Sequence, residues 1–96
     1  MDKQLIVVMK ALSDENRIKI FSILKTQGER CACDLLQDLN IVQSTLSHHM
    51  KILTDARLVT ATKKGKWINY TISKDVCAKT RNDLLELFDG TCCKEA

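Results

Sequence analysis

The sequence predicts a mainly α-helical domain that carries one small β-hairpin, and three observations indicate it. Apolar residues recur at helical spacing through residues 5–53. They alternate with polar residues over residues 68–72, as in a half-buried strand. The chain has 96 residues, which suffice for one modest core. We therefore expect residues 1–90 to form a single domain and residues 91–96 to form a tail.

Two helices are expected before residue 28. The apolar face of the first is formed by Leu5, Val8, Met9 and Leu12. Ser13 is followed by two acidic residues, which predicts that it caps the second helix, and Gly28 is a suitable terminator. The second helix should bury Ile20, Phe21 and Leu24.

A third and a fourth helix should follow, joined by a tight turn. The third, residues 31–39, places Ala32, Leu35, Leu36 and Leu39 on one face, and Asn40 suits a left-handed terminator. The fourth, residues 42–53, turns Val42, Leu46, Met50 and Leu53 inward at about 100° per residue. Its opposite face carries Ser44, Ser47, His48 and Lys51.

The pattern then changes to a hairpin and a last helix. Ile68, Tyr70 and Ile72 lie on one side of a predicted strand, and the preceding loop contains Lys63, Lys64, Gly65 and Lys66. Ser73 can cap a final helix whose apolar stripe contains Cys77, Leu84, Leu87 and Phe88. Four helices, two strands and a fifth helix in this order predict a winged helix-turn-helix.

Such a fold suggests DNA binding, although the net charge of +3 alone decides nothing. A polar helix face is by itself more simply explained as solvated, but the lysine-tipped hairpin at the right distance favours DNA. His49 projects near the inner face and is expected to be a core or interface histidine. The candidate DNA-binding residues are Gln43, Ser44, Thr45, Ser47, His48, Lys51, Lys63, Lys64 and Lys66.

Five cysteines raise a separate question. We expect a cytoplasmic, unprocessed protein without a membrane span, in which a disulfide scaffold is improbable. Side chains at i and i+2 lie roughly 200° apart on a helix, so Cys31 and Cys33 can share an ion only at an irregular helix start or after distortion. Burial explains Cys31 at most, whereas Cys77 is most simply a core or interface residue.

Several stretches resemble the ArsR/SmtB family of metal-responsive bacterial repressors: ALSDENRIKIFSIL, ERCACDLLQDLNIVQSTLSHHMKIL, ARLV and KKGKWINYTI. The resemblance covers nearly the whole chain, and ERCACDL resembles the arsenic-sensing branch. It implies a homodimer, formed through the first and last helices, here residues 5–12 and 76–88. It also implies binding to double-stranded operator DNA when metal-free and release when metal binds.

One departure concerns the metal ligands. The family's best-known arsenic motif has a third cysteine three residues after the second, where this chain has Leu36. Either a further thiolate completes the site, for which Cys92 and Cys93 are candidates, or the ligand needs only two. The predicted metal ligands are Cys31, Cys33, Cys92 and Cys93.

Four thiolates favour a soft or thiophilic ion. The first hypothesis is a sensor of trivalent arsenic or antimony. The second is a cadmium, lead or zinc sensor, the third a sensor of a methylated arsenical, and a reversible disulfide is the redox alternative. We do not expect an enzyme, because neither histidine is placed beside a cysteine and no cleft-forming motif is present.

Overall fold

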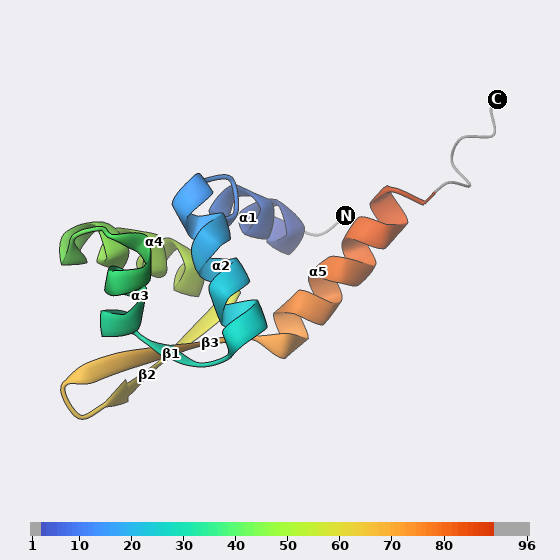
Figure 1. Cartoon of the computed structure of the whole chain (residues 1–96). Coiled ribbons are helices and arrows are strands. Elements are labelled where there is room, and N and C mark those ends of the chain that lie inside the picture. The colour runs from blue at the N-terminus through green and yellow to red at the C-terminus, as the bar shows by residue number, and fades with distance from the viewer. Residues whose placement is uncertain (1–2, 90–96) are drawn as a thin grey trace.

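The computed structural model describes residues 3–89, so the predictions for Cys92 and Cys93 lie outside the described residues. Within these residues, five helices and three strands follow one another (Figure 1). They are α1 (Lys3–Ala11), α2 (Glu15–Gln27), β1 (Arg30–Cys31), α3 (Ala32–Leu39), α4 (Gln43–Asp55), β2 (Val59–Lys64), β3 (Trp67–Ile72) and α5 (Lys74–Leu87). The predicted winged helix-turn-helix is thereby confirmed, with α3 and α4 as its two helices and β2 and β3 as its wing.

The sheet contains one strand more than the sequence predicted. Its order is β1-β3-β2, with both pairs antiparallel. In β1, Arg30 is opposite Tyr70 and Cys31 is opposite Asn69. A two-residue strand has no periodicity of its own, because it exists only through pairing with β3. The wing turn is also shorter than expected: Lys63 and Lys64 belong to β2, and Gly65 takes the positive φ of 63° that this tight turn needs.

A single core lies where α1–α4 meet the base of the wing. Each of these helices contributes buried apolar side chains, as does the hairpin with its preceding loop. The main members are Val8, Ala11, Ile20, Leu24, Leu35, Leu46, Met50, Leu53, Leu58 and Tyr70. The predicted inward faces are therefore confirmed for most positions, while Phe21, Ala32, Leu36 and Leu39 are partly buried against the same core. The prediction was wrong for Met9, which is 43% exposed, because the buried face of α1 runs through Leu5, Val8 and Ala11.

Two local predictions were wrong at helix starts. The N-cap of α2 is Asp14 and not Ser13: the Asp14 carboxylate accepts hydrogen bonds from the amides of Asn16 and Arg17. The Ser13 hydroxyl instead donates to the carbonyl of Lys10. Val42 is not part of the inner face of α4, because it is the N-cap residue and 65% of it is exposed.

The last helix differs from the other four. Ser73 caps α5 as predicted, since its hydroxyl accepts from the Val76 amide at 3.4 Å. Figure 1 shows that α5 projects away from the rest of the chain. None of its residues is buried within the part of the chain that the structure describes, and Phe88, just after it, is 73% exposed. Among residues 3–89, no helix is long and apolar enough to cross a membrane.

Candidate metal centre and nucleic-acid interface

The outer face of α4 is polar and open to solvent. Gln43, Ser44, Ser47, His48 and Lys51 are exposed, and Thr45 is half-buried. The N-cap residue Val42 supplies no side-chain acceptor, so the first amides of α4 are left for water or for an anion such as phosphate. Hydroxyls, an amide and an imidazole on one exposed helix face can bond to base edges and phosphates in a major groove.

The wing carries three lysines at and next to its turn. Lys63 and Lys66 are exposed, and Lys64 is held by Glu29, whose Oε2 lies 2.8 Å from the Lys64 Nζ. The Asn69 amide donates to the same oxygen at 2.6 Å. The hydrogen bond from Lys64, and then that from Asn69, keep the pKa of Glu29 below its ordinary value. Lys64 is therefore held in an ion pair, while Lys63 and Lys66 are exposed to solvent.

The two neighbouring cysteines lie at the junction of β1 and α3. Cys31 ends β1 and is the N-cap of α3, where its sulfur accepts from the Cys33 amide at 3.1 Å. The irregular helix start that the sequence offered as one alternative is therefore present. The structure joins the two sulfurs in a disulfide with a Cα–Cα separation of 5.3 Å, so the expectation of free thiols is wrong for this pair.

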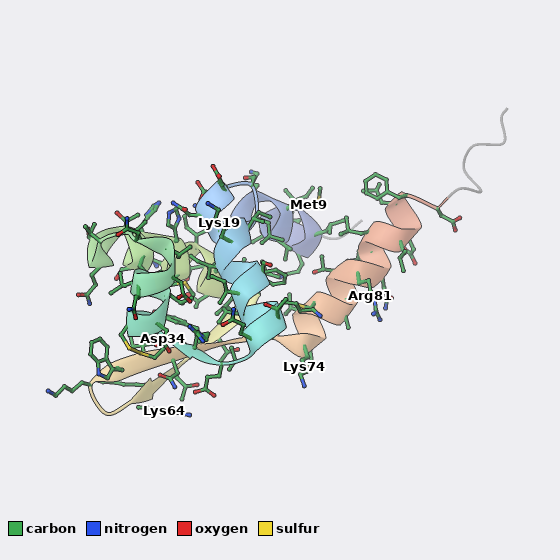
Figure 2. The ribbon with its side chains drawn as sticks, viewed as in Figure 1. Met9, Lys19, Asp34, Lys64, Lys74 and Arg81 are labelled. Atoms are coloured by element: carbon green, nitrogen blue, oxygen red, sulfur yellow. A yellow bond between two sulfur atoms is a disulfide. The ribbon has the colours of Figure 1, made fainter. Side chains whose placement is uncertain are left out.

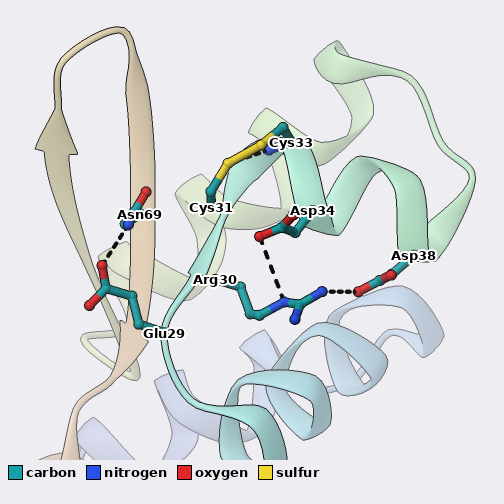
Figure 3. The surroundings of a disulfide bond; sticks show 7 residues. All are labelled: Glu29, Arg30, Cys31, Cys33, Asp34, Asp38 and Asn69. Carbon is teal, nitrogen blue, oxygen red and sulfur yellow. Dashed lines mark hydrogen bonds and ion pairs between the residues drawn. A yellow bond between two sulfur atoms is a disulfide. The ribbon is translucent and has the colours of Figure 1, made fainter.

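An acidic residue joins this pair (Figure 3). A carboxylate oxygen of Asp34 and the sulfurs of Cys31 and Cys33 all lie within 4.8 Å of one another. Arg30 holds the acidic side of the cluster: its Nε lies 4.0 Å from Asp34, and its Nη2 donates to Asp38 at 2.9 Å. Asp34 was not among the ligands predicted from the sequence, although its position directly after Cys33 was an available signal.

The same junction is connected to both the wing and α4. Its β1 side pairs with β3 in the wing, where Cys31 is opposite Asn69. Its α3 side leads through residues 40–42 into α4, and Asn40 makes the predicted left-handed turn with φ of 54°. Glu29, two residues before Cys31, anchors Lys64. This contact joins residues 35 apart in sequence, so no local pattern could have revealed it.

His49 and Cys77 lie in or beside the core, and the four predicted metal ligands differ from them. His49 is buried, as expected, and Cys77 is half-buried beside the core, where burial raises the pKa of its thiol. Cys31 and Cys33 are brought together, while the proposed contributions of Cys92 and Cys93 stay predictions.

Comparison with known proteins places this geometry in context. A family model described as "Bacterial regulatory protein, arsR family" matches residues 14–61, which contain α2, α3 and α4. The chain is 46% identical to an arsenical resistance operon repressor of Staphylococcus aureus, over 77% of this chain and 74% of that protein. It is 38% identical to an arsenical resistance operon repressor of Bacillus subtilis (strain 168), over 88% of this chain and 85% of that protein.

A solved structure shows the same architecture. It is a homodimeric winged helix-turn-helix DNA-binding domain from Mycobacterium bovis, described as a possible ArsR-family transcriptional regulator. It superposes with a TM-score of 0.73 at 27% identity and covers 88% of this chain and 79% of its own. The matched residues contain the helix-turn-helix and the cysteine pair that leads into it. This chain belongs to the arsR family of bacterial regulatory proteins.

Proposed function

We propose that this protein is a homodimeric transcriptional repressor that binds double-stranded operator DNA when free of metal. It dissociates on binding trivalent arsenic or antimony through cysteine thiolates. The relatives named as arsenical resistance operon repressors support this proposal. The observation that carries it is the position of Cys31 and Cys33 at the start of α3, the first helix of the helix-turn-helix.

The chemistry of the site suits a thiophilic ion. After reduction, Cys31 and Cys33 provide two soft ligands on one side of the helix start. Leu36 cannot supply a third, so Cys92 or Cys93 from the tail of either subunit is the proposed source of further sulfur. Asp34 adds an oxygen ligand, which suits cadmium, lead or zinc as the alternative effectors.

The position of the site provides a route from metal to DNA release. An ion bound by both thiolates fixes the geometry of the β1–α3 junction in a new arrangement. Because β1 pairs with β3 and α3 packs on α4, that change moves the wing and the recognition helix relative to each other. A coupling free energy of about 1–3 kcal/mol is typical of such switches and lowers operator affinity by about 5- to 150-fold.

Dimerisation is proposed through α1 and α5. A groove of about 930 Å³ lies between α5 and the α1–α2 face, and leucines and phenylalanines are prominent in its lining. The same two helices also carry exposed apolar side chains, among them Ile6 and Met9 on α1 and Leu85 on α5. In such a dimer, two α4 helices would enter successive major grooves roughly 34 Å apart on an imperfect palindrome. The homodimeric Mycobacterium bovis domain supports this assembly.

An operator gel shift under reducing conditions tests the proposal directly. We expect the metal-free dimer to retard a palindromic operator, and arsenite or antimonite to release it at lower concentrations than cadmium, lead or zinc. Tight binding of a monomer to a single half-site would contradict the dimer. Release by cadmium or lead but not by arsenite would assign the site to a different effector.

Cysteine variants locate the effector site. Cys31→Ser and Cys33→Ser should bind operator nearly as wild type does but should no longer respond to arsenite, because a hydroxyl is a poor ligand for a soft ion. Full arsenite release from the double variant would exclude the C-x-C site. Deleting residues 91–96 should reduce sensitivity to arsenite more than to a methylated arsenical that needs two thiols. An unchanged three-sulfur shell by X-ray absorption would exclude the tail.

The disulfide favours a second candidate function, a redox-switched repressor. Oxidation by peroxide would remove two electrons and two protons from Cys31 and Cys33, form the observed bond and release two waters. Peroxide should then release operator DNA, and dithiothreitol should restore binding. Release by arsenite in the presence of a reductant, with no effect of peroxide, would reject this candidate.

A further inference from the structure

Three helices meet at a buried polar junction that the proposed effector site does not use. Within residues 3–89, His49 of α4 is the one buried side chain that is polar, with 7% exposed. Its Nδ1 lies 3.2 Å from Nη1 of Arg17 in α2. The Arg17 Nε donates to the carbonyl of Ala11 at the end of α1, at 2.6 Å. One guanidinium therefore connects the end of α1 and the start of α2 to the recognition helix.

The N-cap of α2 is part of the same junction. The Asp14 carboxylate accepts from the Arg17 amide at 3.1 Å, and its Oδ2 lies 3.8 Å from the His49 Nδ1. The hydrogen bond from the Arg17 amide is the main cause of the lowered pKa of Asp14. Asp14 is thus a fixed anion that caps α2 and faces both Arg17 and His49.

The chemistry of arginine determines the state of His49. A guanidinium has five N–H donors and no acceptor, so the contact requires an unprotonated Nδ1 that accepts. The ring proton must then be on Nε2. The Asp14 oxygen would favour a proton on Nδ1, but at 3.8 Å it lies beyond hydrogen-bonding distance. Burial, first, and the charges of Arg17 and His48 lower the pKa of His49, while Asp14 opposes them.

This contact is directional, unlike the rest of the α4 packing. The other buried residues of α4 are Leu46, Met50 and Leu53. Because apolar packing is not directional, these side chains fix the distance of α4 from the core more than its rotation about its own axis. His49 directly follows His48 on the same helix, and Ser47 precedes both, so the angle at which His49 meets Arg17 sets the angle at which those two side chains face outward.

We propose that Arg17 and His49 are positioning residues for DNA reading: neutral His49, with its proton on Nε2, accepts from Arg17 and fixes the rotation of α4. The proposal rests on operator binding, the first part of the proposed function. Protonation of Nδ1 replaces an accepted hydrogen bond with two facing cations and frees α4 to rotate. The charged groups acting on His49 are Asp14 and Arg17 from α2 and His48 from α4, and α1 contributes the Ala11 carbonyl, which does not titrate.

The first test measures the proton directly. Long-range ¹⁵N–¹H correlations of the ring nitrogens in the labelled, full-length protein near neutral pH should show His49 with an unprotonated Nδ1 and a protonated Nε2. A proton on Nδ1, as the neutral tautomer or as imidazolium, would overturn the proposal. This measurement needs neither DNA nor a variant, so it is decisive even where a substitution unfolds the protein.

The second test separates positioning from packing. His49→Gln keeps an acceptor for Arg17 and should bind operator within about threefold of wild type, whereas His49→Leu, which lacks one, should bind roughly tenfold more weakly. Arg17→Gln should resemble His49→Leu. Lys19→Gln is the matched control, because Lys19 pairs with Glu15 on the exposed side of α2 and should leave affinity unchanged (Figure 2).

The pH profile supplies a readout that packing alone would not change. Wild-type affinity should decrease as pH falls through the lowered pKa of His49, below its ordinary 6.5, and His49→Gln should lack this component. Identical profiles, or equal affinities of wild type and His49→Leu, would overturn the inference. Failure of the wild type to bind any operator would instead reject the proposed function.

Discussion

The two ends of this molecule use similar apolar patterns with opposite results. In the helix-turn-helix, Leu35 and Leu53 are fully buried. In α5, the leucines and the following phenylalanine recur at the same helical spacing, yet Leu85 is 63% and Phe88 73% exposed. Figure 2 shows Lys64 on the wing and Arg81 on α5 on opposite sides of the molecule. The helix-turn-helix end buries its apolar side chains within one subunit, whereas the α5 end leaves them exposed, as is typical of interaction surfaces.

The largest effect on stability is expected in the helix-turn-helix. Leu53→Ala removes a side chain with no exposed area and should lower the free energy of unfolding by about 2–5 kcal/mol. The matched change Leu85→Ala, on the exposed side of α5, should affect the unfolding of the isolated subunit far less. Denaturant titration at low protein concentration measures both, and equal losses would remove the contrast between the two ends.

The next effect concerns assembly. The double substitution Leu85→Glu, Phe88→Glu places two charges on the exposed apolar surface and should weaken dimerisation by about 2 kcal/mol or more. Sedimentation should show monomers that keep the helical content of the wild type, and affinity for a palindromic operator should decrease with the dimer. A variant that stays dimeric would place the interface elsewhere.

A smaller effect separates the wing lysines. Replacing Lys63, Lys64 and Lys66 by alanine should weaken binding to all DNA sequences alike. It should also reduce the slope of log affinity against log salt by about one unit for each phosphate that is no longer neutralised. Because Glu29 already pairs with Lys64, Lys64→Ala alone should change the slope less than Lys63→Ala. Weaker binding to only one operator sequence would assign the wing to base reading.

The smallest effect is expected at Cys77, which lies between the two ends. Its half-buried thiol packs beside the core and lines the groove under α5. Cys77→Ser should cost about 1 kcal/mol of stability and leave the arsenite response in place. Loss of that response in the gel shift, with stability unchanged, would instead make Cys77 part of the effector site.

Local patterns predicted most of the fold. Helical spacing located the buried faces of α2, α3 and α4, and Gly28 and Asn40 end their helices with positive φ. The prediction of the α2 N-cap was wrong because two neighbouring residues are both suitable for that position. Ser13 and Asp14 can both cap α2, and Asp14 takes the capping position, from which its carboxylate also faces Arg17 and His49.

Tertiary contacts explain what the sequence did not predict at the site. The strand β1 consists of two residues that pair with β3, and the Glu29–Lys64 contact depends on that pairing. The sequence allowed Cys31 and Cys33 to approach each other in only two ways, at an irregular helix start or after distortion of the helix. The structure shows the first, because Cys31 has an extended conformation at the N-cap of α3. The Arg17–His49 contact joins residues 32 apart in sequence.

The pairing of Cys31 with Asn69 has a consequence for engineering this protein. Backbone hydrogen bonds form the β1–β3 ladder, and they depend little on which side chains are attached. The side chains at positions 31, 33 and 34 can therefore be exchanged while the backbone link to the wing stays intact. Under the proposed function, a histidine or carboxylate set placed there would shift the response to a harder ion with the same operator.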